Sequence, residues 1–230
     1  MRNRMKQQMA IGRNELKLIA VFSMLCDHIG CLFFSEAENV FLYSLLRIIG
    51  RLSFVLFCFV LVQGFLSTKN PVKYSSRLLF FALLSEIPFD LAFSHQLFSV
   101  TQQNVLFTFW IALLVLMALQ RWEGCYWKEI LAIVAGCVIT WGMHTDYSFL
   151  GVLLVTNFYL FRFQKKQQME LAVVLLAMFG NGIEIFAILA LPLCYYYAEE
   201  KNEKPLPKYF FYLFYPVHLL VLLGIKMLLF

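Results

Sequence analysis

The stretch that decides the fold is Leu16-Lys17-Leu18-Ile19-Ala20-Val21-Phe22-Ser23-Met24-Leu25-Cys26-Asp27-His28-Ile29-Gly30. It is apolar enough for a membrane helix, yet it carries an acid and a histidine well inside it. Ionisable side chains are costly in a bilayer, so those that occur there usually face a protein interior or a wet cavity and have a function. We therefore predict a membrane helix whose Asp27 and His28 belong to a site for chemistry or transport.

The composition of the whole chain is that of a membrane protein. Of its 230 residues, 61% are hydrophobic and only 14% are charged, whereas soluble domains are about 45–50% apolar and about 25% charged. The net charge of +5 is too small and too scattered to indicate nucleic-acid binding. Closely spaced spans leave no room for a separate soluble domain, so we expect one membrane-embedded domain over residues 1–230.

Apolar segments predict an all-α fold, a polytopic membrane bundle of eight or nine transmembrane helices. A helical span needs about 17–25 apolar residues. The number of helices depends on Leu171–Tyr197, which forms either one long tilted helix or two short helices broken at Asn181-Gly182. The other candidate spans are Leu16–Phe34, Phe41–Leu66, Leu78–Phe93, Asn104–Leu119, Lys128–Gly142, Ser148–Phe163 and Tyr209–Phe230.

Positive charges in alternate loops predict the orientation, because lysine and arginine are enriched on the cytoplasmic side of membrane proteins. Several basic residues precede the first span, and Lys69, Lys73 and Arg77 lie between the second and third spans. The intervening loops carry acids or histidines, such as Glu36 and Glu38, and almost no positive charge. We therefore expect a cytoplasmic N-terminus, and nine helices would place the C-terminus outside.

Several charged side chains are predicted to reach a similar depth in the bilayer. At about 1.5 Å per helical residue, they lie about 12 to 18 Å from the inner end of their spans, or from the outer end for Arg51. This polar layer contains Asp27, His28, Arg51, Glu86, Asp90 and His218, with Arg47 one turn nearer the surface and Asn104 in an outer rim.

The spacing of these residues suggests which side chains share a helix face. Arg47 and Arg51 are four residues apart, as are Glu86 and Asp90, so each pair lies on one face. Asp27 and His28 are adjacent, which separates them by about 100° around the helix. They are therefore not an automatic pair, and Glu86 or Asp90 is an equally good partner for the His28 ring.

Each feature also has a purely structural interpretation. Arg51 with Glu86 or Asp90 is explained equally well as an ion pair that ties two spans together. His218 lies beside Pro216 and has the surroundings of a packing residue, and the basic residues of the Lys69–Arg77 segment are explained as topology signals. The number of ionisable groups in one layer nevertheless exceeds what simple tethering requires, which favours a functional site.

The order of motifs along the chain resembles the TraX family of integral membrane proteins, named for the acetylase of conjugative F-type pilin. The resemblance covers nearly the whole chain and is specific through its combination of motifs. These are Asp27-His28-Ile29, Ile49-Gly50-Arg51-Leu52-Ser53-Phe54, Gln63-Gly64-Phe65, Ser85-Glu86-Ile87-Pro88-Phe89-Asp90-Leu91, Gln103-Asn104-Val105-Leu106-Phe107-Thr108 and Lys208-Tyr209-Phe210-Phe211-Tyr212-Leu213-Phe214-Tyr215-Pro216-Val217-His218-Leu219.

The resemblance implies a membrane acyltransferase, distantly similar to the acyltransferase-3 group, in a bacterial plasma membrane. It implies acetyl-CoA as donor and an amine or hydroxyl as acceptor, which in the namesake is a pilin N-terminus. A sugar, a lipid or a small molecule is also compatible with the residues. No metal is expected, because the histidines and acids lack a local ligand spacing.

Acyl transfer needs a base for the acceptor and a positive group for the oxyanion. We expect His28 to be the base or a transient acyl acceptor, oriented by Asp27, Glu86 or Asp90. Arg51, with Arg47, would stabilise the oxyanion or hold the phosphates of the donor. The residues expected to bind donor or substrate are Arg47, Lys69, Lys73, Arg77, Asn104, Lys208, Tyr212, Tyr215 and His218.

Two other classes of function remain open from the sequence. A proton-coupled transporter or flippase would use the same polar layer, because intramembrane acids and histidines also build proton relays. An assembly factor of a secretion or pilus apparatus would depend on surface partners instead, and neutralising Arg51 or His28 would leave its function intact.

Overall fold

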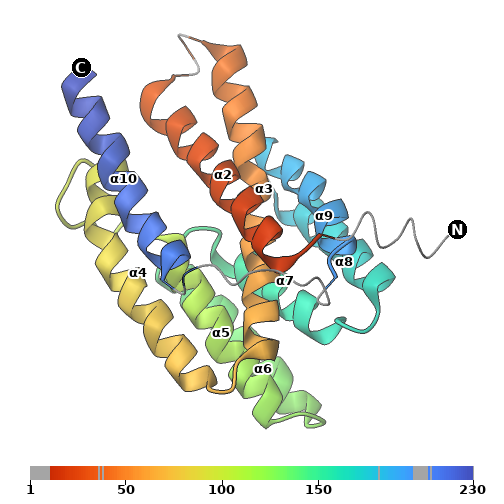
Figure 1. The fold of residues 1–230 in the computed structure, drawn as a ribbon. Coiled ribbons are helices and arrows are strands. Elements are labelled where there is room, and N and C mark those ends of the chain that lie inside the picture. Colours follow the sequence, from red (N-terminus) through yellow and green to blue (C-terminus); the bar gives the residue numbers. More distant parts are fainter. Residues whose placement is uncertain are drawn as a thin grey trace, which may run out of the picture. The chain divides into compact units, whose positions relative to one another are not determined.

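A computed structural model describes residues 11–35, 37, 39–180, 182–198, 207 and 209–229 of the chain. In these residues the regular structure consists of nine α-helices, one 3-10 helix and two isolated bridges (Figure 1). The all-α class predicted from the sequence is therefore confirmed. The helices fall into two compact units, and the single membrane domain that we expect over residues 1–230 stays a prediction beside this division.

Unit 1 comprises Met1–Val60 and Lys165–Phe211. Its helices are α2 (Arg13–Phe33), most of α3 (Val40–Ser67), α8 (Lys165–Phe179), the 3-10 helix η1 (Gly182–Ala190) and α9 (Leu191–Tyr195). α8 packs against η1 and α9. A parallel bridge joins Ile11 to Tyr197, so the segment that enters α2 is held against the segment that leaves α9.

Unit 2 comprises Leu61–Gln164 and Tyr212–Phe230. Its helices are the end of α3, α4 (Pro71–Phe93), α5 (Val105–Arg121), α6 (Tyr126–Gly142), α7 (Ser148–Leu160) and most of α10 (Phe210–Leu229). α5 is the central helix of this unit, because it packs against α4, α6 and α7. Leu113 and Leu116 of α5 and Leu154 of α7 are fully buried.

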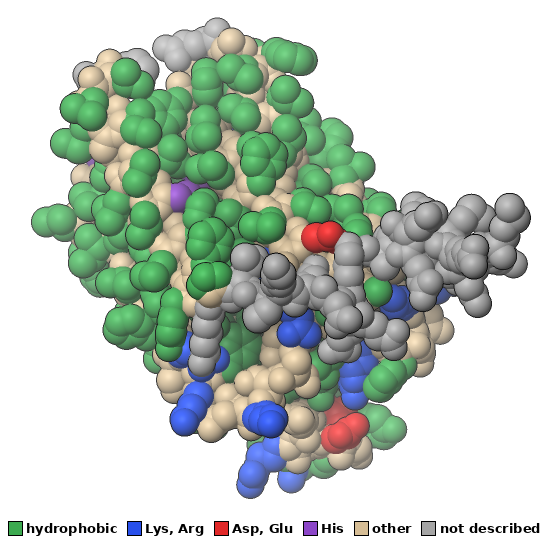
Figure 2. Space-filling view, in the orientation of Figure 1, with side chains coloured by type: hydrophobic (Ala, Val, Ile, Leu, Met, Phe, Trp, Pro, Cys, Tyr) green, Lys and Arg blue, Asp and Glu red, His purple; other side chains and the backbone are tan. Residues whose placement is uncertain are grey.

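Among the described residues, three helices, α2, α3 and α10, are long and apolar enough to cross a membrane by length and composition. Shorter apolar helices are α5, α7 and the stretch Gly182–Tyr195. Large hydrophobic side chains remain exposed on many helices, and Figure 2 shows that they form much of the face drawn. This combination is the one expected of a polytopic membrane bundle, in which lipid covers the outward apolar surface.

α6 buries small residues against its neighbours and exposes its large ones. Its large residues, such as Trp127 and Val134, are exposed, whereas Gly136 is buried. A Cβ atom at Gly136 would meet a methyl group of Val115 at 2.5 Å and one of Val152 at 3.3 Å. The small residue therefore lets α6 approach its neighbours in unit 2, while its large side chains point outward.

The predicted break near Asn181-Gly182 is present. α8 ends at Phe179 and the next helix begins at Gly182, which has a positive φ of 55°. The Leu171–Tyr197 stretch is therefore broken into two short helical segments, as in the second predicted alternative, and does not form one long helix. The 3-10 geometry of Gly182–Ala190 was not predicted, since runs of this helix longer than about four residues are uncommon.

Candidate functional site

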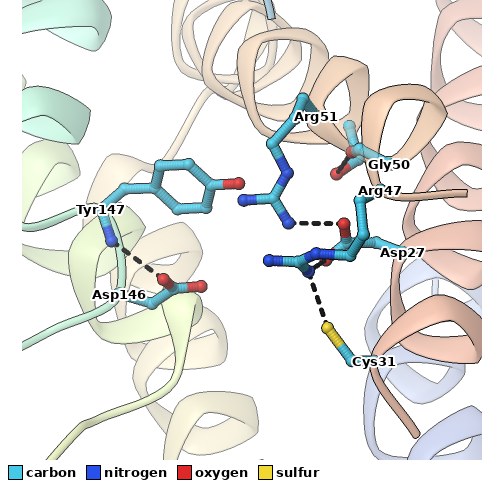
Figure 3. A network of polar contacts seen from close by, with 8 residues as sticks. Asp27, Cys31, Arg47, Gly50, Arg51, Asp146 and Tyr147 are labelled. Carbon is cyan, nitrogen blue, oxygen red and sulfur yellow. Dashed lines mark hydrogen bonds and ion pairs between the residues drawn. The ribbon is translucent and has the colours of Figure 1, made fainter. Parts of the chain in front are cut away.

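Two arginines of α3 converge on one carboxylate of α2 in unit 1 (Figure 3). Arg47 Nη1 donates to Asp27 Oδ2 at 2.8 Å, and Arg51 Nη2 donates to Asp27 Oδ1 at 2.5 Å. The four-residue spacing places both guanidinium groups on the face of α3 that meets α2. The side chains of Asp27 and Arg51 are 11% and 8% exposed, so the contact is largely withdrawn from solvent.

A glycine makes this contact geometrically possible. Gly50 lies between the two arginines on α3, and a Cβ atom there would overlap the side chain of Asp27. Gly30, one turn after Asp27, has a similar role, because a Cβ atom there would lie 3.1 Å from the Cβ of Leu46. Gly50 was expected only as part of a motif, and its position between two arginines in the sequence was the available signal.

The cluster contains two guanidinium groups and one carboxylate. A simple tether between helices needs one cation for one carboxylate, so the second guanidinium is an excess in a setting where buried charge is costly. Arg47 Nη1 also lies 2.7 Å from Cys31 Sγ, one turn beyond Asp27 on α2. Such a cluster can attract an anion, because guanidinium groups offer fixed N–H donors to phosphate or to a developing oxyanion.

His28 follows Asp27 on α2 and is half-buried. Both oxygens of Asp27 are engaged by the arginines, one by each. The Asp27 carboxylate is therefore paired with the two guanidinium groups. Orientation of the His28 ring by Asp27, Glu86 or Asp90 stays a prediction.

The predicted acid pair of α4 lies in unit 2 and is buried. Glu86 Oε2 accepts hydrogen bonds from the backbone and side-chain amides of Asn104. Asp90 Oδ2 accepts a hydrogen bond from the backbone N–H of Ser99 at 2.7 Å. The two carboxylates thus hold the loop between α4 and α5, and an ion pair of Arg51 with either acid stays a prediction.

Asn104 connects this acid pair to the start of α5. Its Oδ1 accepts from the backbone N–H of Leu106 at 3.0 Å and so caps the helix, while Nδ2 donates to Ala82 O at 2.9 Å and to Glu86. The residue is fully buried. The outer-rim residue predicted from the sequence is therefore a structural junction between α4 and α5.

The aromatic and histidine residues predicted on α10 also lie in unit 2. Tyr212 stacks on Phe81 of α4, with ring centroids 5.0 Å apart. The Tyr215 side chain is buried, and the backbone amide of Val105 is one of its hydrogen-bond partners. His218 Nδ1 lies 2.7 Å from Phe214 O. Its position fits the packing interpretation of this histidine.

The turn between α6 and α7 forms a second polar cluster in unit 2. The Thr108 hydroxyl donates to Asp146 O at 2.5 Å and to Thr145 Oγ1 at 2.9 Å. Asp146 Oδ1 accepts from the backbone N–H of Tyr147 at 3.1 Å (Figure 3). Tyr147 has a positive φ of 58°, a conformation that costs free energy in residues other than glycine and clusters at functional sites.

The role of this turn was not predicted from the sequence. Asp146 was expected in a loop and in the outer rim of the polar layer, and Thr108 and Tyr147 were not predicted as site residues. The bridge that pairs Gln103 with Thr145 brings the turn to the start of α5. Local periodicity carries no signal for such a contact, because the two segments are about forty residues apart in the sequence.

The predicted donor-binding basic residues lie at the N-terminal end of α4. Lys69 and Lys73 are exposed and Arg77 is half-buried, with its guanidinium 5.9 Å from the centroid of the Tyr74 ring. Asn70 caps the helix by accepting from the Lys73 backbone N–H at 2.9 Å. The remaining predicted residue, Lys208, lies outside the described residues.

Two comparisons with known proteins found matches over most of the chain. A family model described as TraX protein matches residues 12–226. The probable fimbrial assembly protein FimC, serogroup H1, of Dichelobacter nodosus is 34% identical over 237 residues, and the alignment covers 93% of this chain and 95% of that protein. No solved structure matches the chain.

Proposed function

Because the chain belongs to the TraX family, we propose that it is a membrane acyltransferase that moves an acetyl or another acyl group from acyl-CoA to an amine or hydroxyl acceptor. The observation that carries this proposal is the convergence of Arg47 and Arg51 on Asp27. Asp27 holds the two guanidinium groups together, and two fixed guanidinium groups suit an anionic substrate group or an oxyanion.

The proposed reaction uses His28 as base. For an amine acceptor, the nitrogen attacks the carbonyl carbon of the thioester, and the C–N bond forms as negative charge collects on the carbonyl oxygen beside Arg51. The C–S bond then breaks with its electron pair on the sulfur of CoA. The proton lost by the nitrogen passes to His28 and on to the CoA thiolate.

The donor is proposed to be acetyl-CoA, with its phosphates bound at the N-terminal end of α4. Lys69 and Lys73 present exposed cations there. The backbone amides at the beginning of this 23-residue helix add partial positive charge, which stabilises phosphate. The residues present therefore fit the charged part of the donor. We place this end and the N-terminus of the chain on the cytoplasmic side of a bacterial plasma membrane.

The acceptor is proposed to be the N-terminus of a pilin or of another peptide. The printed name of the Dichelobacter nodosus relative assigns fimbrial assembly to that protein, and the namesake of the TraX family acts on pilin. A protein in this role would meet its acceptor in the bilayer or at its outer surface.

Release of CoA by the purified full-length protein tests the proposal. With acetyl-CoA and a peptide acceptor, the wild type should release CoA and acetylate the peptide. His28→Asn and Arg51→Ala should each lower turnover about a hundredfold or more, the usual cost of losing a catalytic base or an oxyanion donor.

Two matched variants control for nonspecific effects. Arg121→Ala removes an exposed arginine, and His95→Asn replaces an exposed histidine whose positive φ of 54° asparagine tolerates. Both should keep full turnover. A folded wild type that neither binds acetyl-CoA nor releases CoA would overturn the proposal, as would full turnover by folded His28→Asn and Arg51→Ala proteins.

A proton-coupled transporter is the second candidate, and Asp90 favours it. Asp90 is fully buried, and in the part of the chain that the structure describes its Oδ1 has no hydrogen-bond partner. Buried acids of this kind form proton relays in transporters. A transporter would move its substrate in proteoliposomes in proportion to the proton gradient and would consume no CoA.

A further inference from the structure

Glu86 and Asp90 of α4 are two buried acids, each with one oxygen that has no hydrogen-bond partner among the described residues. Glu86 is 6% exposed and Asp90 is fully buried. Glu86 Oε2 accepts from the backbone and side-chain amides of Asn104, and Asp90 Oδ2 accepts from the backbone N–H of Ser99 at 2.7 Å. The second oxygens, Oε1 and Oδ1, are buried without a partner. Such atoms are rare and costly in native structures, so both require a physical explanation.

The two acids lie on the same face of one helix. α4 continues through Pro88, so Glu86 and Asp90 keep the four-residue spacing that brings Cβ atoms to about 5–6 Å from each other. Both side chains also hold the same loop, because Ser99 and Asn104 belong to the connection between α4 and α5. A common face and a common loop place the two carboxyl groups within reach of each other.

The cations of α4, of α5 and of their connecting loop do not neutralise this pair. On α4 the nearest one is Arg77, which precedes Glu86 by about 14 Å along the helix axis. The titratable side chain of α5, Arg121, lies exposed at the far end of that helix, and His95 in the loop is also exposed. In the described part of unit 2, neither acid forms an ion pair.

The other elements of unit 2 bring neutral or negative groups. α10 contributes the buried phenol of Tyr215, which interacts electrostatically with Glu86 and with Asp146 of the α6–α7 turn. His218 of α10 has Nδ1 on a carbonyl oxygen of its own helix. Residues 61–67, the end of α3, have no titratable side chain. Two full negative charges on the pair would therefore be opposed by each other and by a further acid.

The hydrogen bonds determine which oxygen of each acid can carry a proton. Asn104 and Ser99 approach Glu86 Oε2 and Asp90 Oδ2 with N–H donors, so these two oxygens are acceptors. A protonated carboxyl group has a single O–H donor. That donor must be Oε1 in Glu86 or Oδ1 in Asp90, the two atoms that have no partner.

We propose that Glu86 and Asp90 form a binding site for one proton, which they share between Oε1 and Oδ1 in an O–H···O bond. One group is then a neutral acid and the other a carboxylate, so the pair carries one negative charge instead of two. Hydrogen bonds of this charge-assisted kind are among the strongest in proteins. The site is independent of the proposed acyl transfer.

The shared proton stabilises the connection between α4 and α5. While it is bound, each acid keeps its other oxygen on an amide of the loop, at Ser99 and at Asn104. When high pH removes the proton, two buried carboxylates repel each other. We expect this repulsion to loosen the loop, so that unit 2 responds to pH at this point.

Infrared spectroscopy of the purified full-length protein in detergent tests the shared proton. A protonated carboxyl group has a C=O stretching band that a carboxylate lacks, and the wild type should show this band at neutral pH. Glu86→Gln and Asp90→Asn should each lose it. In these variants an amide N–H takes the place of the shared O–H, and the remaining acid ionises.

The pH dependence of unfolding gives a second measure. In the unfolded chain both carboxyl groups are ionised above about pH 5, so folding of the wild type takes up one proton at neutral pH. Because the folded state binds more protons, stability falls as the pH rises, until the folded protein releases the proton as well. Relative to Glu86→Gln, the unfolding equilibrium constant of the wild type should rise about tenfold for each pH unit in this range.

Glu123→Gln is the matched control, because it makes the same chemical change at an exposed acid of unit 2. It should keep both the infrared band and the pH dependence of the wild type. An unchanged band and an unchanged pH dependence in folded Glu86→Gln and Asp90→Asn proteins would overturn the proton site. If neither variant folds, the wild-type spectrum decides, because a folded wild type without the band at neutral pH excludes the shared proton.

Discussion

The carboxylate of Asp27 occupies the space that a side chain at Gly50 would fill, so the acid lies directly against the backbone of α3. The residues that flank this glycine on the same face, Arg47 and Arg51, close on the carboxylate from either side. A helix contact normally separates backbones by the thickness of two side chains. Because Gly50 has no side chain, the Asp27 carboxylate comes within hydrogen-bond distance of both arginines.

Gly50→Ala should therefore destabilise the protein. The added methyl group overlaps Asp27, and overpacking of a buried contact costs about 1–3 kcal/mol of the free energy of unfolding. Unfolding of the purified protein by SDS in mixed micelles measures this loss. Gly224→Ala is the matched control, because a Cβ atom there meets nothing within 4 Å, and alanine is the better helix former.

A double-mutant cycle links the loss to Asp27. If the methyl group acts by overlapping the Cβ and the carboxylate of Asp27, Gly50→Ala should cost little in a protein that already carries Asp27→Gly. Equal costs in the two backgrounds would contradict the geometric explanation.

Arg51→Ala should cost more stability than Arg47→Ala. Both guanidinium groups donate to Asp27, but the Arg51 side chain is 8% exposed whereas that of Arg47 is 22% exposed. Breaking a buried pair on one side costs about 3–5 kcal/mol, because the other charge stays buried, and water moderates this cost at Arg47. The same SDS titration measures both, with exposed Arg121→Ala as the neutral control. A larger loss for Arg47→Ala would refute the burial argument.

Helix positions were largely predictable from the sequence, because apolar periodicity and length decide where a chain can cross a bilayer. The expected span Phe41–Leu66 lies within α3, and Asn104–Leu119 agrees with α5 to within two residues at each end. The break before Gly182 was predicted because glycine and asparagine favour turns. The 3-10 geometry after it depends on tertiary context, for which single-sequence periodicity carries no signal.

The residues of the candidate site were predictable as a set, whereas their partners were not. The depth of a residue in the bilayer follows from its position along the helix. This depth predicted Asp27, Arg51 and Glu86 as members of one polar layer. Pairing depends on how the helices rotate and how closely they approach, and Gly50 determines that approach for Asp27. The bonds between Glu86 and Asn104 depend on a loop conformation that has no sequence period.

Asn104→Ala should destabilise the protein more than Asn70→Ala. Both residues cap helices, and loss of a cap costs about 1 kcal/mol. Asn104 is also buried and donates to Ala82 O and Glu86, whereas Asn70 is exposed. Chemical unfolding of the two variants side by side checks this difference. Equal losses would mean that the contacts with Glu86 and Ala82 contribute nothing.

Thr108→Val should lower stability, whereas Thr156→Val should leave it unchanged or raise it. The two threonines are buried and the substitution keeps their shape. Thr108 donates to Thr145 and to Asp146 O, so its removal leaves buried acceptors unsatisfied at a cost of about 1–3 kcal/mol. Among the described residues, Thr156 Oγ1 has no partner to lose. Thermal unfolding followed by tryptophan fluorescence distinguishes the pair, and the reverse order would contradict the assigned bonds.

The 3-10 helix η1 changes how far a short segment reaches. A 3-10 helix rises about 2.0 Å per residue against about 1.5 Å for an α-helix, so the nine residues of η1 extend about 18 Å instead of about 13.5 Å. With the five residues of α9, the segment reaches about 25 Å, close to the hydrocarbon thickness of a bilayer of about 30 Å. The 3-10 geometry thus lengthens a segment of only fourteen residues, so that local helix type, as well as residue number, determines hydrophobic length.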